Sequence, residues 1–164
     1  MLSMGLASES SHSQSRGEPR RAILAIDYGR RRIGLALSDV SGLIARPLGI
    51  LPRTNRRNDV VRLRELCRNH GVGSIVVGWP IHLDGTPGTM AAEAARFADR
   101  LRKQLGLPVD LLDERLSSWE AEQVISASRP TKRASLPKNK TLDDLAAAVI
   151  LRDYLSRTAR GTRG

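Results

Sequence analysis

Short apolar runs separated by turn-forming residues open this chain. The run AILAID at residues 22–27 is apolar up to its final aspartate, which is typical of a central strand covered on both faces. IGLALSD at 33–39 and LIARPLGILPRT at 43–54 predict two further strands. Because the three segments are close in sequence, we expect them to pair as an antiparallel meander.

Helical spacing begins after the third strand. Apolar residues recur at Val60, Leu63, Leu66 and Cys67, which predicts a helix over Asn58–His70 that Gly71 ends. A second helix is expected at Thr89–Leu105, with its inward residues at Ala92, Ala95, Phe97 and Leu101. The remaining predicted elements are strands at 74–78 and 109–114 and helices at Ser117–Ser128 and Thr141–Arg157.

This order of elements predicts an α/β fold in which a sheet begins with three antiparallel strands and continues through crossover helices. A chain of 164 residues fits one domain, which we place at 22–157. Residues 1–21 are interpreted as a disordered arm, and residues 158–164 as a basic tail.

Composition points to a polyanionic partner. The formal net charge is +10 and the pI is about 11.1, which favours nucleic acid, although anionic membranes also attract such surfaces. Aromatic residues make up only 3% of the chain, so single-strand stacking is disfavoured and backbone contacts to structured nucleic acid are expected. The single cysteine, Cys67, indicates a cytoplasmic protein and is interpreted as a buried apolar residue. No run of 18 apolar residues exists, so no membrane span is predicted.

Acidic residues close the first and last predicted strands. Ligands of open α/β sheets bind at the carboxyl ends of the strands, where Asp27 and Glu114 fall. If the two strands are neighbours, about 4.8 Å apart, both carboxylates could bind one cation. The alternative is that each acid simply marks where its strand reaches solvent.

A third candidate acid lies at the start of the last predicted helix. Asp143 shares a helical stripe with Ala147, Ile150 and Tyr154, which should face the sheet, whereas Asp144 should face outward and complete a capping box. A carboxylate on a core-facing stripe needs a partner such as a metal ion. Three carboxylates without a histidine or cysteine cluster favour Mg²⁺ or Mn²⁺.

Four segments in order resemble the YqgF/RuvX family: ILAIDYGRRRIGLALSD, VVGWPIHLDGTPG, LLDERLS and LDDLAAAVILRDYL. Its members are Holliday junction resolvases and pre-16S ribosomal RNA nucleases with a ribonuclease H-like fold. The resemblance implies a five-stranded mixed sheet flanked by helices. It also assigns the family's three acids to Asp27, Glu114 and Asp143. Two departures are Trp79, where the family often has leucine, and the additional acid Asp144.

The reaction expected from this resemblance is metal-dependent hydrolysis of phosphodiester bonds, with two ions sharing the activation of water and the stabilisation of the leaving oxygen. Resolvases of this fold commonly use four acids and this chain offers three, so the two-ion arrangement stays open. Precursor 16S ribosomal RNA is favoured as the substrate over the four-way DNA junction. A resolvase makes two symmetric cuts and would act as a homodimer.

Basic residues near these acids in sequence are candidates for binding phosphates. They are Arg30, Arg31, Arg32, Arg115, Lys138 and Lys140.

Two other classes of protein are alternatives to a nuclease. An actin-like ATPase or sugar kinase requires two such domains, and a non-catalytic binding module would not require all three acids.

Overall fold

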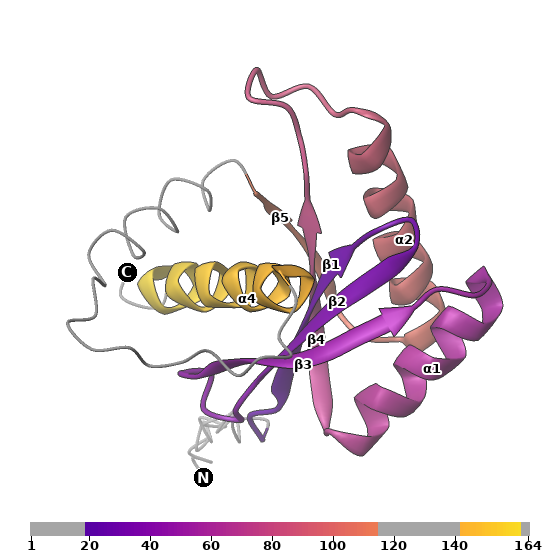
Figure 1. The fold of residues 1–164 in the computed structure, drawn as a ribbon. Coiled ribbons are helices and arrows are strands. Elements are labelled where there is room, and N and C mark those ends of the chain that lie inside the picture. The colour runs from indigo at the N-terminus through magenta and orange to yellow at the C-terminus, as the bar shows by residue number, and fades with distance from the viewer. Residues whose placement is uncertain (1–18, 115–141, 162–164) are drawn as a thin grey trace, which may run out of the picture.

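The computed structural model describes residues 19–114 and 142–161 of the chain (Figure 1). Three strands come first: β1 (Ala22–Tyr28), β2 (Arg32–Ser38) and β3 (Ala45–Pro52). They are followed by α1 (Arg56–Asn69), β4 (Val72–Trp79), α2 (Thr89–Leu105), β5 (Val109–Asp113) and α4 (Leu142–Gly161). The helix predicted at Ser117–Ser128 lies outside the described residues.

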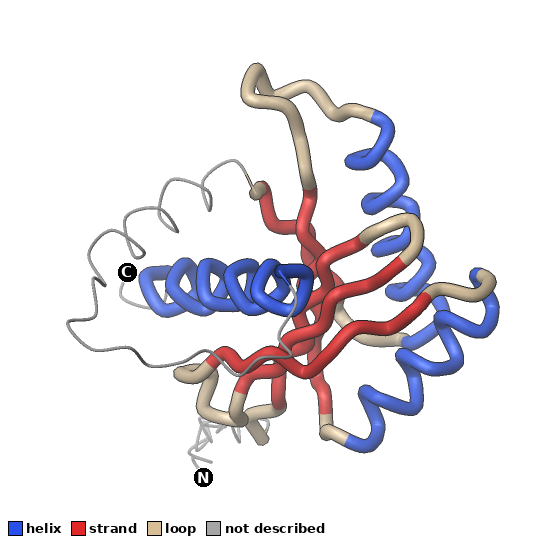
Figure 2. The backbone as a smooth tube through the Cα atoms, viewed as in Figure 1, coloured by secondary structure: helices blue, strands red, loops and turns tan. Residues whose placement is uncertain are grey.

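The five strands form one mixed sheet in the order β3-β2-β1-β4-β5. The first three pair antiparallel, and β4 and β5 add parallel to β1 (Figure 2). This confirms the predicted meander and the five-stranded mixed sheet. One condition considered for the acids is not met, because β4 lies between β1 and β5, so the strands that carry Asp27 and Glu114 are not neighbours.

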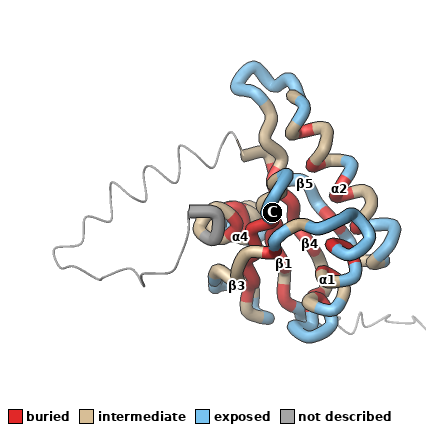
Figure 3. Tube along the Cα trace, turned by 45° about the vertical axis from the view of Figure 1, so that its right-hand side comes forward, coloured by how far each residue is buried: buried red, intermediate tan, exposed pale blue. Residues whose placement is uncertain are grey.

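Helices cover both faces of the sheet. Helices α1 and α2 pack on one face, where alternate strand residues such as Leu24, Ile26 and Val77 form the larger core with Leu63 and Phe97. Helix α4 crosses the other face, as Figure 1 shows. A smaller core lies beneath it, made of Ala25, Ala36, Val76, Leu112, Ala147, Ile150 and Leu151. Figure 3 shows these buried segments inside a shell of exposed loops.

Helix α1 begins two residues before the predicted start. The side chain of Asn55 accepts a hydrogen bond from the backbone of Asn58 and caps the helix at Arg56. Apolar periodicity could not reveal this first turn, because its arginines are exposed. Gly71 follows the helix with a φ of 61°, the left-handed conformation expected of a terminating glycine.

Two details of the other helices also differ from prediction. In α2 the inward alanines are Ala91, Ala94 and Ala98, whereas Ala92 and Ala95 are only half-buried, so the prediction was wrong at these two alanines; Phe97 and Leu101 are buried as predicted. Helix α4 extends beyond Arg157 to Gly161, into the segment predicted as a tail. None of the described helices is long and apolar enough to cross a membrane.

Candidate active site

Asp27 lies one residue before the end of β1 and is half-buried. Side chains alternate between the two faces of a strand. Ile23 and Ala25 pack with the core under α4, so Asp27 belongs to the α4 face as well. Its partner in β2 is Gly34, and both residues line the same cavity.

Glu114 follows β5 directly, and its backbone N–H donates to the carbonyl of Trp79 at 3.3 Å. A glycine in the intervening strand explains how its carboxylate can approach Asp27. A Cβ atom built on Gly78 of β4 would lie well within van der Waals contact distance of Glu114 Oε1 and 3.1 Å from Glu114 Cδ. The carboxylate of Glu114 therefore occupies the space that a side chain at position 78 would fill, on the same face as Asp27.

The electrostatics agree with this approach. Burial raises the pKa of Glu114 to about 7, and the negative charges of Asp27 and Asp113 act in the same direction. Ile150 of α4 covers the same spot, since its Cδ1 atom would lie 2.6 Å from the Cβ built on Gly78. The site is thus a partly desolvated pair of carboxylates that repel one another, an arrangement that a bound cation would relieve.

The third predicted acid, Asp143, lies in the first turn of α4. Ala147 and Ile150 follow it by four and seven residues, and both are buried against the sheet. Tyr154, the last residue of the predicted stripe, is half-buried and donates a hydrogen bond to Asp110 of β5. The stripe thus faces the sheet as expected. The side chains of Asp143 and Asp144 lie outside what the structure describes.

The arginine-rich turn between β1 and β2 borders the acids. Arg30, Arg31 and Arg32 are exposed and, together with Asp27, Gly29 and Gly34, line a cavity of about 350 Å³. Arg30 also binds Glu93 of α2, with Nη2 3.0 Å from Oε1. The other three predicted phosphate-binding residues, Arg115, Lys138 and Lys140, lie outside the described residues.

Oxygen-rich carboxylates on one edge of a sheet suit a hard divalent cation such as Mg²⁺. Over residues 19–114 and 142–161, no group of three or more histidine, cysteine, aspartate or glutamate side chains is gathered tightly enough to hold a metal. The donors that the structure brings together are Asp27 and Glu114. Two mutually repelling carboxylates fit a divalent cation, and a further acid would complete its set of ligands.

Sequence reasoning missed two parts of this region. Gly78 could have been noticed as a glycine that ends an apolar strand, since such residues often mark a close approach. Asp59 lies fully buried in the apolar stripe of α1. The available signal was the position of Asp59, which precedes Leu63 by four residues and Leu66 by seven, the spacing of one helical face.

Cys67 is 6% exposed, and burial raises the pKa of its thiol to about 11. This confirms its interpretation as a buried apolar residue.

A mixed sheet in the order β3-β2-β1-β4-β5, with helices on both faces, is the architecture of the ribonuclease H-like fold. The sequence model of the RuvX family, described as Holliday junction resolvase, matches residues 21–157. The chain therefore belongs to the RuvX family.

Named relatives share much of the sequence. A protein of Syntrophus aciditrophicus named "Putative pre-16S rRNA nuclease" is 44% identical over 135 residues, which span 81% of this chain and 87% of that relative. A protein of the same name from Geobacillus kaustophilus is 41% identical over 134 residues, covering 80% of this chain and 95% of that protein. Both matches extend over most of the relative's length.

Solved structures share the fold. RuvC of Thermus thermophilus, in complex with a Holliday junction substrate, superposes with a TM-score of 0.54 at 17% identity. The match covers 85% of this chain and 96% of RuvC. This agreement confirms the ribonuclease H-like fold predicted from the sequence.

Proposed function

We propose that this protein cuts structured ribosomal RNA precursors at a site formed by Asp27, Glu114 and Asp143, with Mg²⁺ or Mn²⁺ as cofactor. The observation that carries the proposal is the approach of Glu114 toward Asp27 across Gly78. Such a pair of hard carboxylates has little structural use in a partly buried position, because its mutual repulsion destabilises the fold. The names of the relatives favour the RNA substrate.

Each part of the chain has a distinct task in this reaction. Asp27 and Glu114 bind the cation, and the first turn of α4 brings Asp143 to the same face. The cation, when bound, supplies Lewis acidity for the attack of water on phosphorus. Ile150 shields Glu114 from solvent, which strengthens every electrostatic interaction at the site. Arg31 and Arg32 lie beside Asp27 and bind phosphates of the substrate.

The test is the variant Asp27→Asn, which removes a charge and keeps the shape of the side chain. Cleavage of a pre-16S RNA fragment should be abolished with Mg²⁺ present, while binding to the same RNA persists. Asp99→Asn is a matched control, since Asp99 is exposed on α2 and binds only Arg102 and Lys103 among the described ion pairs. Wild-type rates in Asp27→Asn would refute the assignment of the site.

The description of the RuvX family favours a second substrate, the Holliday junction. Cleavage of a four-way junction should be measured beside the RNA with one preparation of the protein. A resolvase would cut the junction symmetrically and as a dimer. Preference for the junction, together with a dimer in solution, would favour this second function over RNA processing.

A further inference from the structure

A second polar site lies on the opposite face of the sheet, between α1, α2 and the end of β1. It is a pocket of about 300 Å³ lined by Arg30, Arg53, Arg56, Glu93, Arg96 and Arg100. The rings of Tyr28 and Phe97 complete its wall, with their centroids 5.0 Å apart. Five guanidinium groups and one carboxylate therefore surround a cavity large enough for a small anion.

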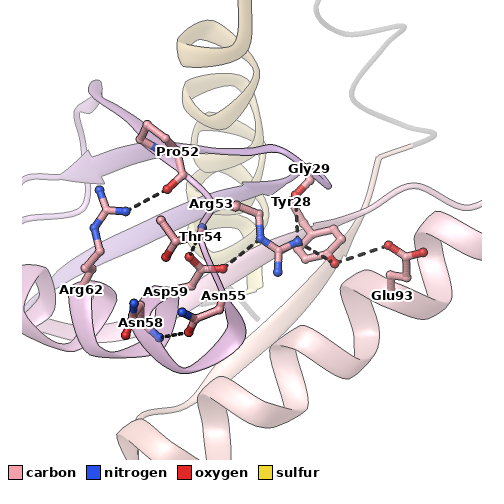
Figure 4. Close-up of polar contacts among 10 residues, drawn as sticks. All are labelled: Tyr28, Gly29, Pro52, Arg53, Thr54, Asn55, Asn58, Asp59, Arg62 and Glu93. Carbon is pink, nitrogen blue, oxygen red and sulfur yellow. Dashed lines mark hydrogen bonds and ion pairs between the residues drawn. The ribbon is translucent and has the colours of Figure 1, made fainter.

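One of these arginines is held rigidly. Arg53 donates from Nε to the buried carboxylate of Asp59 at 3.0 Å, and from Nη1 to the hydroxyl of Tyr28 at 2.9 Å (Figure 4). It also donates to the carbonyl of Gly29 at 3.1 Å and lies over the Tyr28 ring. A guanidinium fixed in this way loses little conformational entropy when it binds a ligand.

The charge in the pocket is only partly balanced. Arg53 is paired with Asp59, and Arg30 with Glu93, whose pKa Arg30 holds below its usual value. Among the ion pairs formed within residues 19–114 and 142–161, none involves the other three arginines of the wall, which are Arg56, Arg96 and Arg100. The pocket thus has an excess of positive charge, contributed by forked donors that suit phosphate oxygens.

The position of the pocket connects it to the acids. Tyr28 follows Asp27 directly in β1, so the two side chains lie on opposite faces of the same strand end. Arg30 belongs to both regions, since it lines the pocket and also the cavity next to Asp27. A nucleic-acid strand that passes over the carboxyl edge of β1 would reach the acids on one face and the arginines on the other.

We propose that this arginine pocket binds a backbone phosphate of the nucleic-acid substrate, at a nucleotide neighbouring the one that is cut. The inference rests on the proposed nuclease function and adds an anchor on the face opposite α4. Its task is to fix the register of the strand over Asp27 and Glu114. Because the pocket recognises phosphate, it should act on RNA and DNA alike and carry no sequence preference.

The experiment compares two double variants of the full chain. Arg96→Ala/Arg100→Ala removes two charges from the pocket. The control, Arg68→Ala/Lys103→Ala, removes two charges from the last turns of α1 and α2. These turns lie near the amino ends of β4 and β5, away from the pocket. Binding to a structured pre-16S RNA fragment is measured against salt in the Asp27→Asn background, and cleavage is measured in the wild-type background. A third variant, Arg96→Lys/Arg100→Lys, keeps the charge and removes the forked donors.

We expect the pocket variant to bind about tenfold more weakly than the control variant. Its slope of log K against log salt should flatten by about one unit, because the protein then neutralises one phosphate fewer. The lysine variant should keep the slope and bind with reduced affinity, because it retains the charges without the bidentate geometry. Cleavage should fall with binding, while melting temperatures of all three variants stay close to that of the wild type.

Equal binding by the pocket and control variants, in a protein that cleaves normally, would overturn the pocket and leave the nuclease function intact. Failure of the wild type to bind or cleave nucleic acid would overturn both. A third arm uses inorganic phosphate and a 5′-mononucleotide. If these raise the melting temperature of the wild type and not of the pocket variant, while RNA affinity is unchanged, the pocket binds a free phosphate compound and the assignment to substrate is wrong.

Discussion

Replacing Gly78 by alanine should disable the active site with little damage to the fold. The added Cβ would lie 2.6 Å from Ile150 Cδ1 and 3.1 Å from Glu114 Cδ, and closer still to Glu114 Oε1. These atoms are the ends of flexible side chains, so they can move away. Neither Gly78 nor its neighbours in β4 have a positive φ, so backbone strain does not contribute.

The expected effects concern two separate quantities, the stability of the fold and the rate of cleavage. Crowding of a buried position costs about 1–3 kcal/mol of folding stability. The carboxylate of Glu114 must shift by on the order of 1 Å, and a displacement of that size in a catalytic group costs about 100-fold in rate. On the proposed function Mg²⁺ stabilises the folded protein, and Gly78→Ala should reduce that stabilisation, because the binding free energy of the ion contributes directly to stability.

Gly73→Ala provides the matched control. Gly73 lies at the other end of the same strand, and a Cβ there would lie 2.6 Å from Cβ and 2.9 Å from Cδ of Arg21. Cleavage rates and melting temperatures, with and without Mg²⁺, are measured for both variants. Gly73→Ala should lose stability and keep its activity once folded.

Either of two results would refute this reasoning. Wild-type cleavage by Gly78→Ala would show that the observed position of Glu114 is not needed for the reaction. An equal loss of activity in Gly73→Ala would show that any crowding of β4 inactivates the protein.

Four further variants test the acids. Because the pKa of about 7 for Glu114 exceeds the ordinary 4.5, its neutral form stabilises the metal-free protein below about pH 4.5, and this contribution is lost as pH rises through 7. The wild type should therefore lose up to about 3 kcal/mol of stability between these pH values, measured by chemical unfolding with a chelator present. Glu114→Gln should not show this loss, and an unchanged pH profile in the variant would contradict the raised pKa. Asp143→Asn should abolish cleavage, whereas Asp144→Asn should cost only about 0.5–1 kcal/mol of stability. If activity and melting assays show the reverse for the two variants, the assignment of Asp143 to the site is wrong. Asp59→Asn should cost about 3 kcal/mol in urea unfolding by leaving Arg53 without its counterion, and a loss below about 1 kcal/mol would argue against that pair.

The sequence predicted the architecture well because its apolar runs and breakers agree with the fold. Strands that are buried on both faces, such as β1 and β4, leave a continuous apolar signal, and terminating glycines such as Gly71 and Gly106 mark the ends of helices. The extent of the alanine-rich helix α2 was predicted correctly, and so were its buried residues Phe97 and Leu101, but its inward alanines were not. Alanines occur on both its buried and half-buried sides, so only Phe97 and Leu101 distinguish the faces.

The geometry of the site was less accessible. The strand-end rule identified Asp27 and Glu114 individually, but sequence order says nothing about which strand is inserted between their strands. The approach of the two carboxylates depends on Gly78, which matters because it has no side chain. A missing side chain gives the sequence no functional group by which such a position could be recognised. The pocket of arginines likewise draws on β1, the β3–α1 connection and α2, segments far apart in the chain.

The placement of β4 between β1 and β5 also affects when the two acids can come together during synthesis of the protein. A ribosome releases the N-terminal end of a chain first, so Asp27 emerges long before β4 and β5 exist to bring Glu114 beside it. The growing chain already carries basic residues that attract ribosomal RNA at close range, but it has no paired carboxylates. The proposed cation site therefore forms only after β5 has been synthesised.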